Sequence, residues 1–229
     1  MVDHKNQTTQ EDNLQEVENV LGRTEAFIEK NQKGIVGVVA VIVVVAVAYM
    51  AYNNFIVAPK EQSALADIEA AQRYFDVDSF NLAINGDGTN AGFLDIIDNY
   101  GSTSTGNLAN YYTGVSYARL GQFDEAIEYL NDFSTDDPLL APISEGLKGD
   151  CQVELGNNSA AIKAYKKAVS FDNELTAPIY LLKVGQVYES EKNYKEALAA
   201  YQTIKSKYAT SIEGRSIDKY IARTQVNLN

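Results

Sequence analysis

The chain has 229 residues and a formal net charge of −12, and this acidic balance excludes nucleic acid as a partner because a phosphate-binding surface needs clustered lysine and arginine. One cysteine, Cys151, excludes an internal disulfide, and one histidine, His4, excludes a histidine-based catalytic or metal cluster in the body of the protein. The charge is uneven: residues 61–157 carry 17 acidic and 3 basic side chains, a net −14, whereas residues 158–229 carry 7 and 11, a net +4. Two solvated faces of different sign, or a polarised scaffold that orients a partner, would both explain this asymmetry.

Residues 1–33 are predicted to form a cytoplasmic tail that ends in an amphipathic juxtamembrane helix. Apolar side chains recur there at helical spacing, at Leu14, Val17, Leu21 and Ile28. Two interpretations stay open: the helix lies on the lipid surface, or it docks against another membrane protein. Acidic residues in the same stretch disfavour contact with anionic lipid and therefore favour the protein partner.

Residues 34–55 are predicted to form a transmembrane helix. From Gly34 to Tyr52 there are 19 residues without a charge. At about 1.5 Å per residue they span roughly 28 Å, close to the thickness of a bilayer core. The apolar stretch is too long, and the segment before it too acidic, for a cleaved signal peptide.

Flanking positive charge predicts the orientation of this helix. Arg23, Lys30 and Lys33 precede the apolar stretch, whereas only Lys60 lies within a similar distance after it. Because cytoplasmic flanks carry the excess of lysine and arginine, we expect the N-terminus in the cytoplasm and the large C-terminal part outside.

Residues 60–100 are predicted to form a degenerate leading repeat of the domain that follows. Pro59 suits the first turn of a helix, and the stretch from Ser63 to Phe75 is amphipathic. The sequence NGDG at 85–88 predicts a turn before a short helix at 93–97. It does not fit a calcium-binding EF-hand, because the first and twelfth loop positions would lack side-chain oxygen.

Three later segments share one spacing of small and large residues. In each, a glycine precedes an alanine by twelve residues, and a large residue follows that alanine by four. Antiparallel helices approach closely only where small side chains meet, so these residues are predicted to lie at helix crossings. The turns are predicted at Gly121-Gln122, Gly156-Asn157 and Lys192-Asn193, where Gly or Asn would supply a left-handed cap. The predicted repeat-packing residues are Gly114, Tyr117, Ala126, Gly149, Ala161, Gly185, Tyr188 and Ala197.

The phrase YYTGVSYARLGQFDEAIEYL at 111–130 closely resembles the tetratricopeptide repeat pattern, and AYKKAVSFD and YKEALAAYQTI continue it. The family's large aromatic residue at the start of the first helix is replaced here by Asn110, Glu145 and Leu181. The resemblance implies an all-α fold, in which a single transmembrane helix precedes an α-α superhelix at 60–229. It implies repeats at 107–140, 142–175 and 178–211, and a C-terminal cap helix at 212–229.

The resemblance also implies that peptides or partner domains bind a concave surface lined by the first helix of each repeat. Family members that hold a partner's C-terminal carboxylate use Lys and Asn on these faces. Tyr111 and Val115 occupy the matching positions here, so we expect no carboxylate clamp. Packing between repeats is an alternative role for Tyr111 and Tyr112. The residues expected to line the surface are Leu108, Tyr111, Val115, Arg119, Asp150, Glu154, Leu182, Gln186 and Glu189.

No sequence pattern indicates catalysis. We find no nucleophile–base pair, no phosphate-cradling glycine loop and no metal-ligand spacing, so we expect neither an enzyme nor a bound cofactor or metal. Cys151 is expected to be a small buried helix residue.

The order of cytoplasmic helix, single span and outer repeats is similar to that of the ancillary subunit of the bacterial SecYEG translocon, the YfgM-like family. The segments DSFNLAINGDG and GFLDIIDNYGSTSTGNLANYY also resemble repeat proteins of Bacteroidetes. The resemblance implies a periplasmic scaffold at the bacterial inner membrane, with a chaperone-like role in protein translocation. Its expected partners are translocon or envelope-assembly subunits and client polypeptides.

Two other functions stay open for this sequence. One is an import-receptor-like protein whose repeats face the cytosol, and the other is a structural subunit of a membrane complex. The sequence also leaves open the oligomeric state and the choice between the concave and the convex surface for binding.

Overall fold

A computed structural model describes residues 30–228, and every regular element in them is helical. The chain divides into two compact units, Met1–Val57 and Ala58–Asn229. Most of the predicted cytoplasmic tail, including His4 and the larger part of the predicted juxtamembrane helix, lies outside the described residues.

The first unit contains the helix predicted as the membrane anchor. The helix runs from Lys30, is long and apolar enough to cross a membrane, and has a mean hydropathy of 2.8 in its most apolar window, none of which is buried. The first unit ends with a π-helical turn, η1 (Asn53–Val57), and the second unit starts with α2 (Ala58–Asp76). Pro59 follows this turn and cannot donate a backbone hydrogen bond. Such a residue suits the first turn of α2, where backbone N–H groups have no partner within the same helix.

The second unit begins with α2, α3 (Phe80–Asn85) and α4 (Phe93–Tyr100). The sequence prediction contained helices at the positions of α2 and α4 but did not include α3. These helices pack against the N-terminal half of the following helix, α5 (Ser104–Arg119). The core that they share is formed by Ile68, Ala71, Ala83, Phe93, Ile96 and Ala109.

The loop between α3 and α4 is held by Asp87. Its carboxylate accepts hydrogen bonds from the backbone N–H groups of Thr89 (2.8 Å) and Asn90 (2.6 Å) and from the Tyr74 hydroxyl (2.6 Å). Gly86 adopts a φ of +75°, and its Cβ position lies only 2.4 Å from the Asn90 carbonyl oxygen, so no other residue fits there. The loop is therefore closed by its own hydrogen bonds, as the turn prediction implied.

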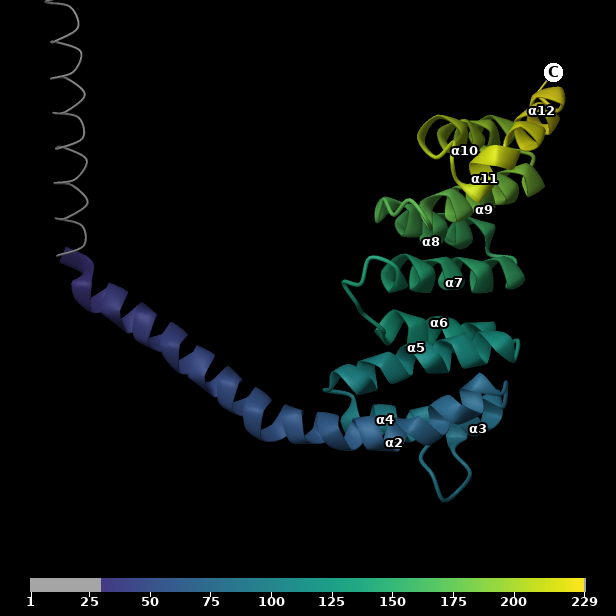
Figure 1. Ribbon diagram of the computed structural model, residues 1–229. Helices are drawn as coiled ribbons and strands as arrows, with labels where there is room; N and C mark the ends of the chain where they lie inside the picture. The colour runs from purple at the N-terminus through teal and green to yellow at the C-terminus, as the bar shows by residue number, and fades with distance from the viewer. Residues whose placement is uncertain (1–29, 229) are drawn as a thin grey trace, which may run out of the picture. The chain divides into compact units, whose positions relative to one another are not determined.

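Three helix pairs then stack in chain order and end in two short helices (Figure 1). The pairs are α5 (Ser104–Arg119) with α6 (Phe123–Asp132), α7 (Leu140–Glu154) with α8 (Asn158–Ser170), and α9 (Ala177–Ser190) with α10 (Tyr194–Lys207).

Each pair crosses at the predicted glycine. A Cβ at Gly149 would lie 2.4 Å from the ring of Tyr165, and a Cβ at Gly185 would lie 2.2 Å from the ring of Tyr201. In the first pair Leu130 takes the place of these tyrosines. The large residue four positions after the alanine thus packs directly on the glycine. A side chain at the glycine position would occupy the same space. The predicted alanines at the crossings are fully buried: Ala126, Ala161 and Ala197.

The turns inside the pairs use a left-handed residue seven positions after each crossing glycine. Gly121 (φ +76°) and Gly156 (φ +75°) follow the prediction. The prediction that Gly or Asn fills this position is wrong in the third pair, where Lys192 has φ +60° and Asn193 has φ −88°. The hairpin geometry fixes which position must be left-handed, and a non-glycine residue there costs about 1–2 kcal/mol.

The C-terminal segment differs from the single cap helix predicted at 212–229. It forms α11 (Ile212–Ser216) and α12 (Asp218–Val226), which meet at the fully buried Ile217. Burial of Ile217 in the core beside α10 requires the chain to change direction there, so one straight helix does not form.

Candidate partner-binding groove

The first helices of the three pairs, α5, α7 and α9, line a groove of about 700 Å³. Five of the nine predicted residues lie in its wall: Tyr111, Val115, Arg119, Asp150 and Glu154. The structure adds seven residues that the sequence did not indicate: Ala118, Gly121, Phe123, Ile143, Leu147, Cys151 and Tyr180. Apolar side chains and a few charges thus share one concave surface, as in many binding sites.

Two exposed charges of opposite sign flank the groove at equivalent positions. Arg119 lies five residues after Gly114, and Glu154 lies five residues after Gly149. Neither forms an ion pair within residues 30–228. Both charges are therefore available to a ligand.

Asp150 is held in a network across the groove floor. It accepts a hydrogen bond from the Tyr165 hydroxyl (2.6 Å), and Lys183 donates to both of its carboxylate oxygens (2.6 and 2.7 Å). The ammonium group of Lys183 also stands over the rings of Tyr165 (5.7 Å) and Tyr180 (5.9 Å). Burial raises the pKa of Tyr180 to about 12, and burial together with the Asp150 hydrogen bond raises the pKa of Tyr165 further. Both phenols stay neutral, and the Tyr165 hydroxyl holds the Asp150 carboxylate in place.

Tyr111 has a packing role as well as a place in the groove wall. Its ring lies against Phe133 (5.2 Å between ring centroids) and against Tyr112 (5.9 Å). Tyr112 stacks on Phe93 at 5.1 Å with an interplanar angle of 10° and does not line the groove. Both interpretations of Tyr111 therefore have a structural basis, whereas Tyr112 belongs to the core.

Four predicted residues lie outside the groove: Leu108, Leu182, Gln186 and Glu189. Leu108 and Leu182 are half-buried, and Leu182 packs against the core of the third pair. Gln186 is exposed.

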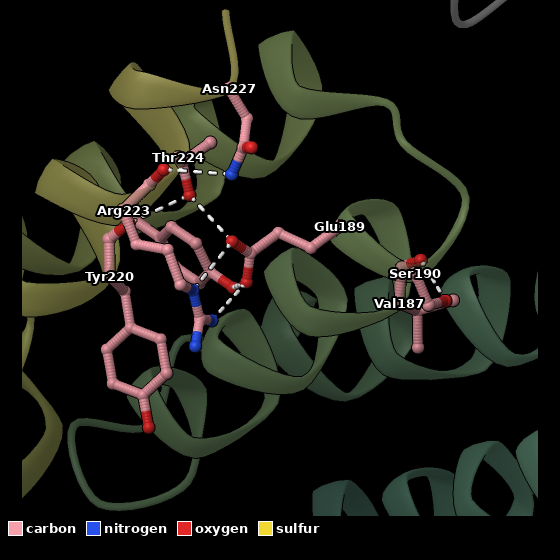
Figure 2. A network of polar contacts seen from close by, with 8 residues as sticks. Val187, Glu189, Ser190, Tyr220, Arg223, Thr224 and Asn227 are labelled. Carbon is pink, nitrogen blue, oxygen red and sulfur yellow. Dashed lines mark hydrogen bonds and ion pairs between the residues drawn. The ribbon is translucent and has the colours of Figure 1, made fainter.

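Glu189 is occupied by α12 and does not face a ligand. Figure 2 shows its carboxylate between Arg223, with which it forms an ion pair, and the Thr224 hydroxyl, which donates at 2.9 Å. The Tyr201 hydroxyl donates to it as well, at 2.7 Å. Only 12% of the Glu189 side chain is exposed. Burial raises the pKa of Glu189, but the hydrogen bonds from Arg223, Tyr201 and Thr224 outweigh it, so the net pKa is lowered.

A one-residue difference in register explains this placement. Arg119 and Glu154 lie five residues after their crossing glycines, whereas Glu189 lies four residues after Gly185. A shift of one residue rotates a side chain by about 100° around a helix. It therefore turns Glu189 away from the groove and toward the helix that packs next.

Sequence reasoning missed the hydrogen-bond partners of Asp150, namely Tyr165 and Lys183. The only available signal was the large residue four positions after the alanine, which named Tyr165 as a packing residue without indicating its hydroxyl. Lys183 reaches Asp150 from 33 positions away. Such a pair can be predicted only once the stacking of α7 on α9 is known.

Comparison with known families identifies the repeats. The tetratricopeptide repeat family model matches residues 113–176 and, in a second placement, residues 147–212. No curated protein sequence matches the chain.

Several solved structures share the fold at low sequence identity. The crystal structure of MamA protein aligns with a TM-score of 0.54 at 18% identity, over 72% of this chain and 90% of MamA. A second MamA crystal structure gives 0.51 at 19% identity, over 69% and 94%. A kinesin light chain protein of Podosopora anserina with nearly identical TPR-like repeats gives 0.53 at 12% identity, over 71% and 84%. The chain thus contains tetratricopeptide repeats in an all-α superhelical fold.

Proposed function

We propose that this chain is a membrane-anchored scaffold that binds partner proteins in the groove formed by α5, α7 and α9. The observation that carries the proposal is the groove itself: apolar side chains line it together with two exposed charges, Arg119 and Glu154, that form no ion pair within the described residues. A groove that combines apolar side chains with a few charges suits the side chains of a polypeptide.

The apolar helix that begins at Lys30 supplies the membrane anchor in this proposal. All its residues up to Ile56 are exposed, and they include long runs of valine and isoleucine. Exposing such a surface to water is unfavourable by about 25 cal/mol per Å², whereas lipid accommodates it. The excess of basic residues before the apolar stretch supports a cytoplasmic N-terminus and an outer position for the repeats.

The scaffold acts without catalysis in this proposal. Cys151 is the one cysteine thiol in the groove wall, and burial raises its pKa to about 11. At neutral pH the thiol is therefore protonated and a poor nucleophile.

The cellular role that we propose is protein export or envelope assembly at a bacterial inner membrane. The order of anchor and repeats, which is similar to that of the ancillary SecYEG translocon subunit, supports this role. The partners would be translocon or envelope-assembly subunits and the polypeptides that they handle. A tether beside the membrane raises the effective concentration of the scaffold toward partners in the same membrane.

Two experiments test the proposal. In the first, spheroplasts that express the full chain are treated with protease, and we expect degradation of the repeats but not of a cytosolic marker. Protection of the repeats in intact spheroplasts, with cleavage only after lysis, would instead support the import-receptor-like alternative.

In the second, the full chain is purified in detergent with its bound proteins. We expect translocon or envelope-assembly subunits, and we expect them to be lost when Arg119→Glu and Glu154→Arg are combined. Lys195→Glu on α10, an exposed lysine outside the groove, is the matched control and should retain them. Recovery of only cytosolic proteins would contradict the export role. Stoichiometric partners that are insensitive to the amount of client would favour a structural subunit.

A further inference from the structure

The second helices of the first two pairs carry opposite charge. Helix α6 has four acidic residues and no basic ones, whereas α8 has three lysines and no acidic residue. All seven side chains are exposed: Asp124, Glu125, Glu128, Asp132, Lys163, Lys166 and Lys167.

The reversal of charge occurs at equivalent positions of the two repeats. Glu128 lies two residues after Ala126, and Lys163 lies two residues after Ala161. Asp132 and Lys167 each lie six residues after the same alanines. Helices α6 and α8 therefore carry side chains of opposite charge at equivalent positions of the repeat.

A shallow depression of about 320 Å³ runs between these helices, on a different surface from the groove. Ile127 and Asn131 of α6 and Ala160, Lys163 and Ala164 of α8 contribute to its wall. Glu145, Lys148 and Gln152 of α7 and Lys167 of α8 complete the wall, so the depression combines a few small and apolar side chains with polar and charged ones.

Most of the charged side chains of α6 and α8 form no ion pair within the described residues. Lys167 pairs with Glu145 at 2.7 Å, and Lys166 donates to the Tyr188 hydroxyl at 2.9 Å. Lys163 and the four acids of α6 form no ion pair within the described residues. A partner with basic side chains opposite α6 and acidic side chains opposite α8 would therefore complement these charges.

We infer that a second copy of this chain docks on this face, with α6 of one copy against α8 of the other and the reverse contact around a two-fold axis. Such an interface is isologous, so each charge pair occurs twice. A uniformly acidic or uniformly basic partner would meet like charge on one of the two helices, and an anionic lipid surface would be repelled by α6. A second copy satisfies both helices at once. The inference does not depend on what binds the groove.

The test measures self-association of the full chain in detergent by sedimentation velocity. We expect a dimer that dissociates as salt rises, because the contact is electrostatic. Lys163→Glu and Glu128→Lys each place like charges against each other at both symmetric sites. Each should raise the dimer dissociation constant about tenfold or more. Lys195→Glu, which makes the same change in net charge as Lys163→Glu but on α10, should leave dissociation unchanged.

Mixing the two single variants tests the two-fold arrangement itself. Two differently tagged chains, one with Lys163→Glu and the other with Glu128→Lys, should co-purify, because opposite charges then meet at both sites. Neither variant should co-purify with a tagged copy of itself. Pairing within one chain would not produce this pattern.

Three results would overturn the inference. A chain that stays monomeric at about 100 μM in low salt would exclude the dimer, since weak specific contacts fall within this range. Single variants that associate as the native chain does would exclude the α6–α8 contact. A native dimer whose two single variants fail to pair when mixed would exclude the two-fold arrangement.

Discussion

The second and third helix pairs contain the same polar arrangement, but only the second faces the groove. In both, a tyrosine that covers the crossing glycine donates its hydroxyl to a carboxylate on the first helix: Tyr165 to Asp150, and Tyr201 to Glu189. Asp150 is 40% exposed and lies in the groove wall, whereas Glu189 is 12% exposed beneath α12.

The tyrosine is at the equivalent position in both pairs, but the carboxylate is not: Asp150 lies one residue after Gly149, whereas Glu189 lies four residues after Gly185. Where another repeat follows, its first helix supplies Lys183 and leaves the carboxylate accessible at the groove. Where the array ends, α12 supplies Arg223 and Thr224 and removes the carboxylate from the surface. The last repeat of a solenoid needs such a cap because no further repeat covers its core.

The largest expected effect comes from removing the buried ring in the third pair. Tyr201 is fully buried, and Tyr201→Ala should lower the free energy of unfolding by about 4 kcal/mol. Tyr201→Phe keeps the ring and loses only the hydrogen bond to Glu189, so it should lower that free energy by about 1 kcal/mol. Chemical unfolding of the full chain in detergent, followed by near-UV circular dichroism of tyrosine, measures both. Equal losses for the two variants would refute the packing role of the ring.

Exchanging the two carboxylates for amides should separate the two networks. Glu189→Gln removes a buried, charge-assisted network and should lower the free energy of unfolding by about 2 kcal/mol. Asp150→Asn acts on a more exposed pair and should lower it by about 1 kcal/mol, because solvent screens the interaction. The same unfolding experiment measures both variants. A larger loss for Asp150→Asn would reverse the assignment of the buried and the accessible network.

The network around Glu189 should respond to pH. The pKa of Glu189 is lowered in the folded protein, so its carboxylate contributes stability above the unfolded pKa, near 4.5, and loses it as the pH falls through the folded pKa. The difference in unfolding free energy between the native chain and Glu189→Gln should therefore be full at pH 7 and shrink below about pH 4.5. Denaturant titrations at pH 7, 5, 4 and 3 measure it. A difference that grows as the pH falls would contradict the assignment.

The smallest expected effect concerns the lysine that bridges α7 and α9. Lys183 is 34% exposed, so Lys183→Met should lower the free energy of unfolding by less than about 1 kcal/mol. Lys205→Met, which breaks the exposed pair with Asp218, is the control and should lower it by less than about 0.5 kcal/mol. A loss above 3 kcal/mol at Lys183 would mean that the groove floor depends on this ion pair for folding.

The all-helical repeat architecture could be predicted from the sequence because it depends on local spacing. The interval of twelve residues between Gly114 and Ala126, repeated twice more, follows from the geometry of a helix hairpin. The groove was predicted in part for the same reason: Val115 and Asp150 each lie one residue after a crossing glycine.

The remaining features depend on contacts between distant segments. Helix α3, the direction change at Ile217 and the contact of Glu189 with α12 require the tertiary arrangement, since no local pattern specifies them. Lys192 is a further case, because the hairpin imposes a left-handed conformation that its residue type does not favour.

Site-specific photocrosslinking in intact membranes tests most directly whether the groove binds a partner. A photoreactive residue replaces Arg119 in the groove wall or, as the control, Lys195 on α10. The account predicts a discrete crosslinked protein from position 119 that is absent from position 195 and disappears when Glu154→Arg is added. No adduct at position 119, or the same adducts from both positions, would contradict a binding groove in this protein.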